Sequence, residues 1–554
     1  MTPFEKTGQI YRAIQLGSPA KLLENALSAL KNYHPNKEEE LMHKSLLASI
    51  FASLTFSSLE PSDAIESIKL YEELMIKGYP LKENDWKNIA KIHQLLYEKT
   101  FSLENIEKGT FAALRAADPI LSAKLLLELY LKVRSDDTFQ LACENISRYL
   151  NANPENVSLL LSKSDLQKEY GLRSKEEKYL SLAINGYEKV LAIEPENSTA
   201  QANIIVTKTF LALFSEDFEL LCDTLAAART ITDDDCISLY AKGVVSVGYS
   251  IAASDMDEVH NAIHFLQSAT SIDRTFYLGW HYLGICFYLV YEALEDVKDL
   301  NLAIKFFKKS LKVRPRAETY IQLAIATARL YDEDNQIEHL EESKCLFEAG
   351  LSLEKASTFP PAEWIFEYGL LLEQLGDEKE DESLLAHSLD QFNRVLILDP
   401  NLHDTHYRIA VVLSHIAELT SDPNCFMRAF CHFRLAHKNY PDHDFVLLDW
   451  GLALISFGEM TDDPHKKHVL MKEAEDKLMR SAKQGNNQAY YQIACFYSLN
   501  NQKEVALEWM KKARSFNVLP PTHEILEDTW LENLRSMAEF HNFIALLNDQ
   551  GSEF

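Results

Sequence analysis

Glycine and proline are both scarce in this chain. Its 554 residues include 17 of each, about 3% apiece against usual values nearer 5–7%. Cysteine is present but unpatterned: the eight positions form no C-x-x-C pair and share no repeated spacing. This excludes a disulfide framework or a cysteine-based zinc site, and we expect reduced thiols in a cytoplasmic protein. Few turn-forming residues predict helices joined by short turns.

Long hydrophobic runs are also missing. Residues 1–16 contain no uninterrupted apolar segment, so we expect no signal peptide. The longest uncharged stretch is 275–291, whose 17 residues lie at the lower limit for crossing a bilayer. Gly279, His281 and Gly284 lie within it at helical spacing, so we expect a buried helix and no membrane span.

Positive charge is in short supply. Lys and Arg number 55 against 83 Asp and Glu, which leaves a net charge of −28. Proteins bind nucleic acids mainly by neutralising phosphates with Lys and Arg. A surface this acidic repels phosphate backbones, so we expect no nucleic-acid partner.

Motifs of catalysis and metal binding are absent too. The chain has no G-x-x-x-x-G-K-[ST], no G-x-G-x-x-G and no G-x-S-x-G. His403 with His406 and His465 with His468 are spaced as H-x-x-H, but neither pair has a further His or Cys at ligand spacing. We therefore expect no cofactor, no metal and no enzymatic activity.

Two amphipathic segments between 280 and 315 are the clearest positive signal. The first places large side chains around one small residue at steps of three and four: Trp280, Leu283, Gly284 and Phe287. The second repeats the arrangement with a smaller contact residue and ends at a proline: Ala303, Phe307, Ser310 and Pro315. Such steps put these side chains on one helix face, and Gly284 lets a second helix approach closely. Two helices of this length cannot bury their apolar faces alone, so further copies are needed.

This order of large, small and aromatic positions resembles the tetratricopeptide repeat family. The resemblance implies an all-α, right-handed superhelical solenoid of antiparallel helix hairpins. Large first-helix anchors recur along the chain at Leu160, Gln201 (the weakest), Leu239, Trp280, Tyr320, Ile365, His406, Leu447 and Tyr490. Their spacing is near 41 residues, whereas the unmodified repeat of the family has 34.

The extra residues lie inside the hairpin. In six copies the anchor precedes the small residue of the second helix by 23 positions, as from Trp280 to Ala303, and the ordinary repeat has 16. Seven added residues make close to two helical turns, so neither apolar face rotates. We predict about one additional turn on each helix.

Three regions are predicted. Residues 1–80 are an irregular helical region, 81–518 the repeat array, and 519–554 capping helices and a tail. The last region contains Leu531, Leu534, Phe540, Phe543 and Leu546, and it resembles the segment that closes some bacterial tetratricopeptide arrays. A solenoid requires such a cap over its last apolar face.

Acidic residues gather in the turns inside the hairpins. Ser421-Asp422-Pro423 and Asp462-Asp463-Pro464 are typical of a helix N-cap followed by proline in the first turn. Residues 377–382 are the densest acidic run. Two interpretations are open: caps that also confer solubility, which the chemistry favours, and an acidic edge that attracts a basic partner.

The candidate binding residues follow from the family resemblance, which implies that positions one and five past each anchor line a concave groove. From Leu239 onward these positions carry no Lys, Arg or Asn, so the carboxylate-clamp function of some family members is not expected. The candidates are Tyr240, His281, Ile285, Ile321, Phe366, Leu370, Tyr407, Val411, Leu448 and Tyr491. They either form an apolar groove for an amphipathic helix or lie inside a wider core.

These features favour a non-enzymatic scaffold or chaperone that holds an apolar or amphipathic segment of a partner protein. The alternative is a regulatory sensor or adaptor that binds a peptide signal or a nucleic-acid-binding protein. An accessory subunit of an enzyme is third. The identity of the partner and the oligomeric state do not follow from the residues.

Overall fold

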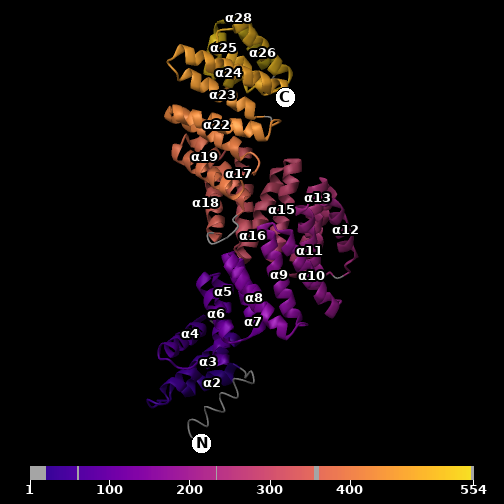
Figure 1. Cartoon of the computed structure of the whole chain (residues 1–554), viewed down its shortest axis with the longest axis vertical. Helices are drawn as coiled ribbons and strands as arrows, with labels where there is room; N and C mark the ends of the chain where they lie inside the picture. The colour runs from indigo at the N-terminus through magenta and orange to yellow at the C-terminus, as the bar shows by residue number, and fades with distance from the viewer. Residues whose placement is uncertain (1–19, 59–60, 233, 355–360, 444, 551–554) are drawn as a thin grey trace. The chain divides into compact units, whose positions relative to one another are not determined.

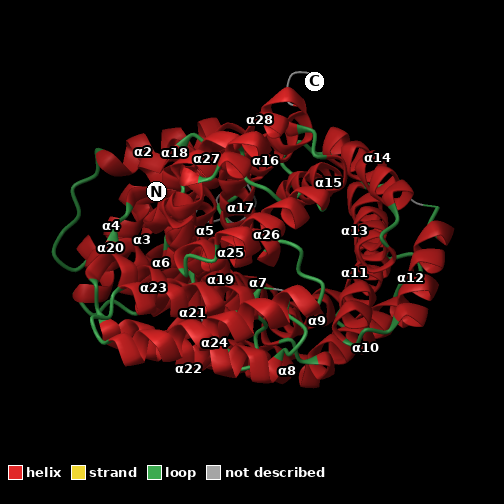
Figure 2. Cartoon of the chain, turned by 90° about the horizontal axis from the view of Figure 1, so that it is seen from above, coloured by secondary structure: helices red, strands yellow, loops and turns green. Residues whose placement is uncertain are grey.

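The computed structural model describes residues 20–58, 61–232, 234–354, 361–443 and 445–550. Helices joined by short loops make up this part of the chain, which contains no strand (Figure 2). Within each of the two units defined below, consecutive helices pack against each other as antiparallel hairpins, and neighbouring hairpins pack together. The prediction of an all-α solenoid of helix hairpins is confirmed.

The chain divides into two compact units. Unit 1 comprises residues 1–333 with 345–360, and unit 2 comprises 334–344 with 361–554 (Figure 1). Helix α18, Ile337–Leu353, contributes residues to both units. The two units are described separately below.

Unit 1 is a succession of helix pairs. Its helices are α2 (Ala20–Lys31), α3 (Glu40–Ser58), α4 (Pro61–Ile76), α5 (Glu83–Thr100), α6 (Leu103–Arg115), α7 (Pro119–Val133), α8 (Asp136–Ala152), α9 (Val157–Ser174), α10 (Glu177–Ile193), α11 (Ser198–Phe214), α12 (Phe218–Thr230), α13 (Cys236–Ala253), α14 (Met256–Ile272), α15 (Tyr277–Leu294), α16 (Val297–Val313) and α17 (Ala317–Asp334). Pairing starts near the N-terminus, where Ser67 Oγ of α4 donates to the carbonyl of Ala48 in α3 at 2.8 Å.

Unit 2 continues the same plan and ends in shorter elements. Its helices are α19 (Ala362–Lys379), α20 (Glu382–Leu398), α21 (Thr405–Thr420), α22 (Pro423–Asn439), α23 (Val446–Glu459), α24 (Pro464–Lys483), α25 (Ala489–Leu499), α26 (Lys503–Ser515), α27 (Thr522–Glu527), the 3₁₀ helix η1 (Thr529–Ser536) and α28 (Ala538–Gln550). Leu531, Leu534 and Phe540 are buried against the α25–α26 hairpin, so this segment covers the last apolar face.

Glycine sets the distance between the helices of a hairpin. A Cβ on Gly284 of α15 would lie 2.5 Å from the ring of Phe307 in α16, and one on Gly369 of α19 would lie 2.7 Å from Phe392 in α20. Real Cβ contacts are never this short, so the two helices could not approach as closely with any other residue. In these two hairpins a glycine faces an aromatic ring, and their contact sets how closely the two helices pack.

The turns inside the hairpins are short and capped. Ser421 adopts a left-handed conformation, φ 56°, and Asp422 then accepts a hydrogen bond from the backbone N–H of Asn424 at 2.9 Å. Glu380 and Asp381 repeat this arrangement before α20. The capping role predicted for the acidic turns is confirmed. Second helices α10, α14, α16, α18, α20 and α22 are each 17 residues long, which accounts for the lengthened repeat.

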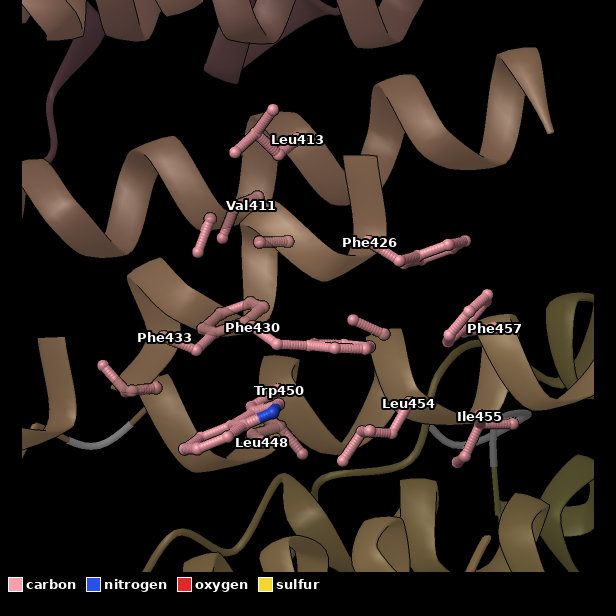
Figure 3. Packing of buried hydrophobic residues seen from close by; sticks show 14 of the residues in the cluster. Val411, Leu413, Phe426, Phe430, Phe433, Leu448, Trp450, Leu454, Ile455 and Phe457 are labelled. Atoms are coloured by element: carbon pink, nitrogen blue, oxygen red, sulfur yellow. The ribbon is translucent and has the colours of Figure 1, made fainter. Parts of the chain in front are cut away.

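Aromatic side chains fill the centre of unit 2. Phe426, Phe430 and Phe433 of α22 pack against Trp450 and Phe457 of α23 (Figure 3). The Phe433 and Trp450 rings are nearly parallel, 7° apart in plane, with centroids 6.2 Å apart. The buried residues form one cluster from α20 to α25, and a second cluster joins α25 and α26 to the C-terminal segment.

One described helix, α13, is long and apolar enough to cross a membrane by length and composition. Of its apolar window, 61% is buried, and it packs against α11 and α14. This is the setting of a core helix in a helical array.

Candidate binding surfaces on the first helices

The ten predicted groove residues lie on the first helices of successive hairpins. They do not form one open surface. Six of them are buried: Tyr240, Ile321, Tyr407, Val411, Leu448 and Tyr491. Four are half-buried: His281, Ile285, Phe366 and Leu370. Phe366 and Leu370 are one turn apart on α19, so they form the most accessible apolar pair among the ten.

Polar atoms of the buried candidates bond to the next repeat. Tyr407 OH donates to Asp449 Oδ2 at 2.6 Å, 42 positions along the chain. Tyr491 OH donates to Asp528 Oδ2 at 2.7 Å. These tyrosines therefore connect neighbouring repeats through hydrogen bonds, a role that their apolar rings did not indicate.

The first helices of unit 2 also carry a row of ionisable side chains. His415 Nδ1 lies 2.7 Å from Asp377 Oδ1, Arg408 Nη1 lies 3.4 Å from Glu373 Oε1, and His443 Nε2 lies 3.0 Å from Asp404 Oδ1. We call the following residues the acid–base row: Glu373, Asp377, Asp404, Arg408, His415, His443 and Asp449. Every pair joins one hairpin to the following one.

Burial shifts the pKa of several groups in this row. Glu373 is 6% exposed, and its Oε2 has no hydrogen-bond partner in the described residues. Burial raises its pKa to about 7, although Arg408 and His415 oppose the shift. Burial lowers the pKa of His415, but the hydrogen bond and charge of Asp377 outweigh it and leave that pKa raised. Glu373 therefore titrates near neutral pH.

The accessible apolar pair and part of the row share one helix face. Phe366, Leu370, Glu373 and Asp377 follow one another on α19 at steps of four, three and four residues, which places them in one line. Phe366 packs against Phe392 with ring centroids 5.4 Å apart, and Asp377 is exposed. Helix α19 thus presents an apolar half and an acidic half along the same face.

A cavity of about 240 Å³ opens where α20 and α22 of unit 2 end and α21 and α23 begin. Its polar lining includes Asn401, Asp404, His406, Tyr440 and His443. Asp404 has a left-handed backbone conformation, φ 64°, at the start of α21. His406 Nδ1 lies 3.1 Å from the Nδ1 of His432, and burial lowers the pKa of both rings. His406, whose pKa burial lowers, and the Asp404 carboxylate make this cavity suited to a hydrogen-bonding or cationic group.

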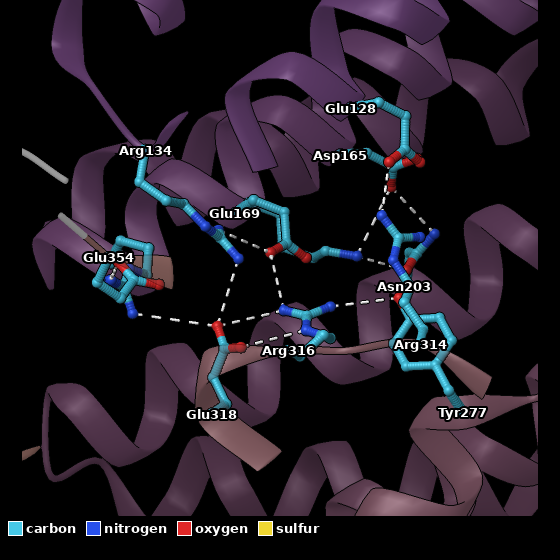
Figure 4. Close-up of polar contacts among 12 residues, drawn as sticks. Glu128, Arg134, Asp165, Glu169, Asn203, Tyr277, Arg314, Arg316, Glu318 and Glu354 are labelled. Carbon is cyan, nitrogen blue, oxygen red and sulfur yellow. Dashed lines mark hydrogen bonds and ion pairs between the residues drawn. The ribbon is translucent and has the colours of Figure 1, made fainter. Parts of the chain in front are cut away.

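Unit 1 contains a different arrangement, a cluster of arginines and glutamates (Figure 4). We call the following residues the ionic cluster: Glu128, Arg134, Glu169, Arg173, Arg314, Arg316, Glu318 and Glu354. Arg314 Nη2 donates to Glu128 Oε2 at 2.5 Å, and Arg134 Nη2 donates to Glu318 Oε1 at 3.3 Å. Arg173 also pairs with Glu354. Partners in these pairs are 181 to 186 positions apart, so the array of unit 1 curves back until α17 meets the ends of α7 and α9.

The cluster fills the inner side of the unit 1 array. Burial raises the pKa of Glu318, but Arg316 and Arg134 outweigh it and hold that pKa well below its ordinary value. His281 lies beside the cluster: its Nδ1 is 3.0 Å from Thr319 Oγ1, and burial together with Arg316 lowers its pKa to about 4. In unit 1, charged side chains of the chain itself thus occupy the face that was predicted to be an apolar groove.

The repeat register could have found three of these residues. Glu169 lies nine positions past the anchor Leu160, Glu373 lies eight past Ile365, and His415 lies nine past His406. The predicted groove residues lie only one and five positions past each anchor, so these three were not among them. Arg314 and Arg316 lie between helices, where periodicity carries no signal.

In the described ranges, no group of three or more His, Cys, Asp or Glu side chains could hold a metal ion. His403 Nδ1 lies 2.5 Å from Asp404 Oδ1, and His465 and His468 are exposed in the first turn of α24. All eight cysteines are free thiols.

The helix hairpins, their small-to-aromatic contacts and their short capped turns define a tetratricopeptide-type helical repeat protein. No family model matches the sequence, and no curated protein matches it. The assignment therefore rests on the hairpins themselves.

Solved structures of helical repeat proteins resemble the chain. The APC/C hetero-tetramer Cut9-Hcn1 matches with 14% identity and a TM-score of 0.43, covering 86% of this chain and 93% of that chain. A human IFIT1 dimer with PPP-AAAA matches with 13% identity and a TM-score of 0.42, covering 82% and 96%. YrrB, a TPR protein with an unusual peptide-binding site, matches with 19% identity and a TM-score of 0.28, covering 37% and 91%.

Proposed function

We propose that the protein is a non-enzymatic interaction scaffold that binds an amphipathic segment of a partner protein on the first-helix face of unit 2. The observation that carries the proposal is the single line of Phe366, Leu370, Glu373 and Asp377 on α19. An amphipathic helix docks by placing its apolar side chains against such a surface.

Charge defines the partner further. The carboxylates of the acid–base row that a partner can reach are Asp377, which is exposed, and Asp404, which is half-buried. Glu373 is buried with a pKa of about 7, and Asp449 accepts the hydrogen bond of Tyr407. Basic side chains beside the apolar face of the partner helix would meet Asp377, and the cavity at Asp404 could receive one of them. Unit 1 offers less surface to such a helix, because its arginines and glutamates already pair with each other.

The test uses two synthetic helical peptides of equal length, one built from Leu and Lys and the other from Leu and Glu. Binding to the full chain is measured by fluorescence anisotropy. We expect the basic peptide to bind and the acidic one to bind much more weakly. Leu370→Ala should weaken the basic peptide at least about tenfold, as expected of an interface anchor.

Leu435→Ala is the matched control. Leu435 is 40% exposed on the second helix α22 of the same unit, away from the α19 line. It should leave affinity unchanged. Equal binding of both peptides, or equal losses in the two variants, would contradict the proposal.

A further inference from the structure

A small cavity lies where the C-terminal ends of α7 and α16 meet in unit 1. Its volume is about 40 Å³, enough for a few atoms of water size. Four cationic side chains line it: Lys132, Arg134, Arg314 and Arg316. The carboxylates in its lining are Glu318 and Glu354. Arg134, Arg314 and Arg316 pair with glutamates of the ionic cluster, so Lys132 is the cation of this lining that has no ion pair in the described residues.

Lys132 has no carboxylate within ion-pair distance in the described part of the chain. Arg314, its neighbour in the lining, already pairs with Glu128. Burial lowers the pKa of Lys132, and the positive charge of Arg314 lowers it further. A half-buried ammonium beside a second cation is therefore uncompensated here.

Arg134 supplies hydrogen-bond donors at the same wall. The residue is 6% exposed, and its Nε and Nη1 find no hydrogen-bond acceptor among the described residues. Its Nη2 donates to Glu318 Oε1 at 3.3 Å, and Nη1 is 3.5 Å from Glu169 Oε2, an ion pair without hydrogen-bond geometry. A buried N–H group without an acceptor is destabilising, and an oxyanion would remove that defect.

The helix C-termini account for part of this gathering of cations, but they do not satisfy the hydrogen-bond donors of Lys132 and Arg134. Arg134 and Arg314 are the C-cap residues of α7 and α16, and cations are favoured near the partial negative charge of a helix C-terminus. That interaction does not provide acceptors for the guanidinium N–H groups of Arg134. It also gives Lys132 no hydrogen-bond partner.

We propose that this cavity binds a small oxyanion of the carboxylate or inorganic phosphate type, held by Lys132 and Arg134. The planar guanidinium matches the paired oxygens of such an anion, and the ammonium adds a point charge. The bound anion lies between the end of α7 and the loop before α17, at the point where the array of unit 1 closes on itself. The site is separate from the proposed α19 surface and does not depend on it.

The test is isothermal titration of the full chain with inorganic phosphate and, in a second arm, with acetate. Low millimolar anion at constant ionic strength avoids the general stabilisation that phosphate gives every protein at high concentration. We expect saturable binding of at least one anion, and Lys132→Gln should raise its dissociation constant at least about tenfold. Binding of phosphate alone assigns the site to phosphate groups, and binding of acetate as well assigns it to carboxylates.

The matched control is Lys124→Gln, which removes the same charge from an exposed position on the same helix. It should bind the anion as the unmodified protein does, and both variants should keep the unmodified helix content by circular dichroism. If neither anion binds, or if the two lysine variants lose affinity equally, the cations serve only the helix ends and the ion pairs.

Discussion

The ionic cluster of unit 1 and the acid–base row of unit 2 contain charged groups of different kinds. In the ionic cluster of unit 1, arginines meet glutamates 181 to 186 positions away. In the acid–base row of unit 2, partners are 35 to 42 positions apart, which is one repeat. The cluster pairs arginines with glutamates such as Glu318, whose pKa is held well below its ordinary value, whereas the row contains Glu373, whose pKa is raised to about 7.

The two sets of charged groups therefore have different roles: one closes the array of unit 1, and the other responds to pH in unit 2. Glu318 stays ionised over the physiological pH range, because Arg316 and Arg134 hold its pKa well below its ordinary value. Glu373, whose pKa is raised to about 7, changes charge in that range and with it the ion pair to Arg408 in the next hairpin. We therefore expect the stability of unit 2 to depend on pH more than that of unit 1.

The largest expected effect is in the cluster. Glu318→Gln removes the carboxylate that Arg134 and Arg316 share, and it leaves buried cations without compensation. The free energy of unfolding of unit 1 should fall by about 3–5 kcal/mol, as when one partner of a buried ion pair is removed. Hydrogen exchange of α7, α9 and α17 peptides in rising urea measures it. Glu188→Gln, at an exposed position on α10, is the control and should change stability by less than about 0.5 kcal/mol.

The second prediction concerns pH and unit 2. Between pH 4.5 and about 7, the folded chain keeps a proton on Glu373 that the unfolded chain releases. Stability therefore falls as the pH rises through this window and stays lower above it, by on the order of 1–3 kcal/mol. The raised pKa of His415 acts in the same direction, because its stabilisation is lost as the pH rises through the folded value.

Glu373→Gln should remove most of this pH dependence and should stabilise unit 2 at pH 8. Urea unfolding at pH 5 and pH 8, followed by hydrogen exchange of α19 and α21 peptides, is the measurement. Unit 1 serves as the internal reference, since the cluster predicts little change over the same range. A steeper pH dependence in unit 1 than in unit 2 would reverse the comparison.

The smallest effect is expected at the tyrosine link between repeats. Tyr407→Phe removes the hydroxyl that donates to Asp449, a half-buried carboxyl whose pKa desolvation raises. The loss should be about 1–2 kcal/mol in unit 2, the size of one buried hydrogen bond. Melting temperature and urea midpoint measure it. If Tyr407→Phe is neutral, the tyrosines one past each anchor act only through their rings.

Periodicity predicted the hairpins because it reports which face of each helix is apolar. The contact of Gly284 with Phe307, the repeat near 41 residues and the cap at Asp422 all follow from residues close together in sequence. The candidate groove residues were placed on the correct helices, but their burial was not predictable. Whether Tyr407 or Val411 is open depends on how closely the next hairpin packs, and that distance is set by residues about 40 positions away.

Local sequence determined the helices, their pairing and their caps, since these depend on side chains within one or two turns of each other. Left-handed turn residues such as Glu380 and Ser421 gave no signal, because glycine is the usual marker of that conformation and is absent there. The ionic cluster, the cavity at Lys132 and the acid–base row were decided by the tertiary structure. Curvature of the array accumulates over several repeats, so it brings Arg134 to Glu318 only after the whole of unit 1 has folded.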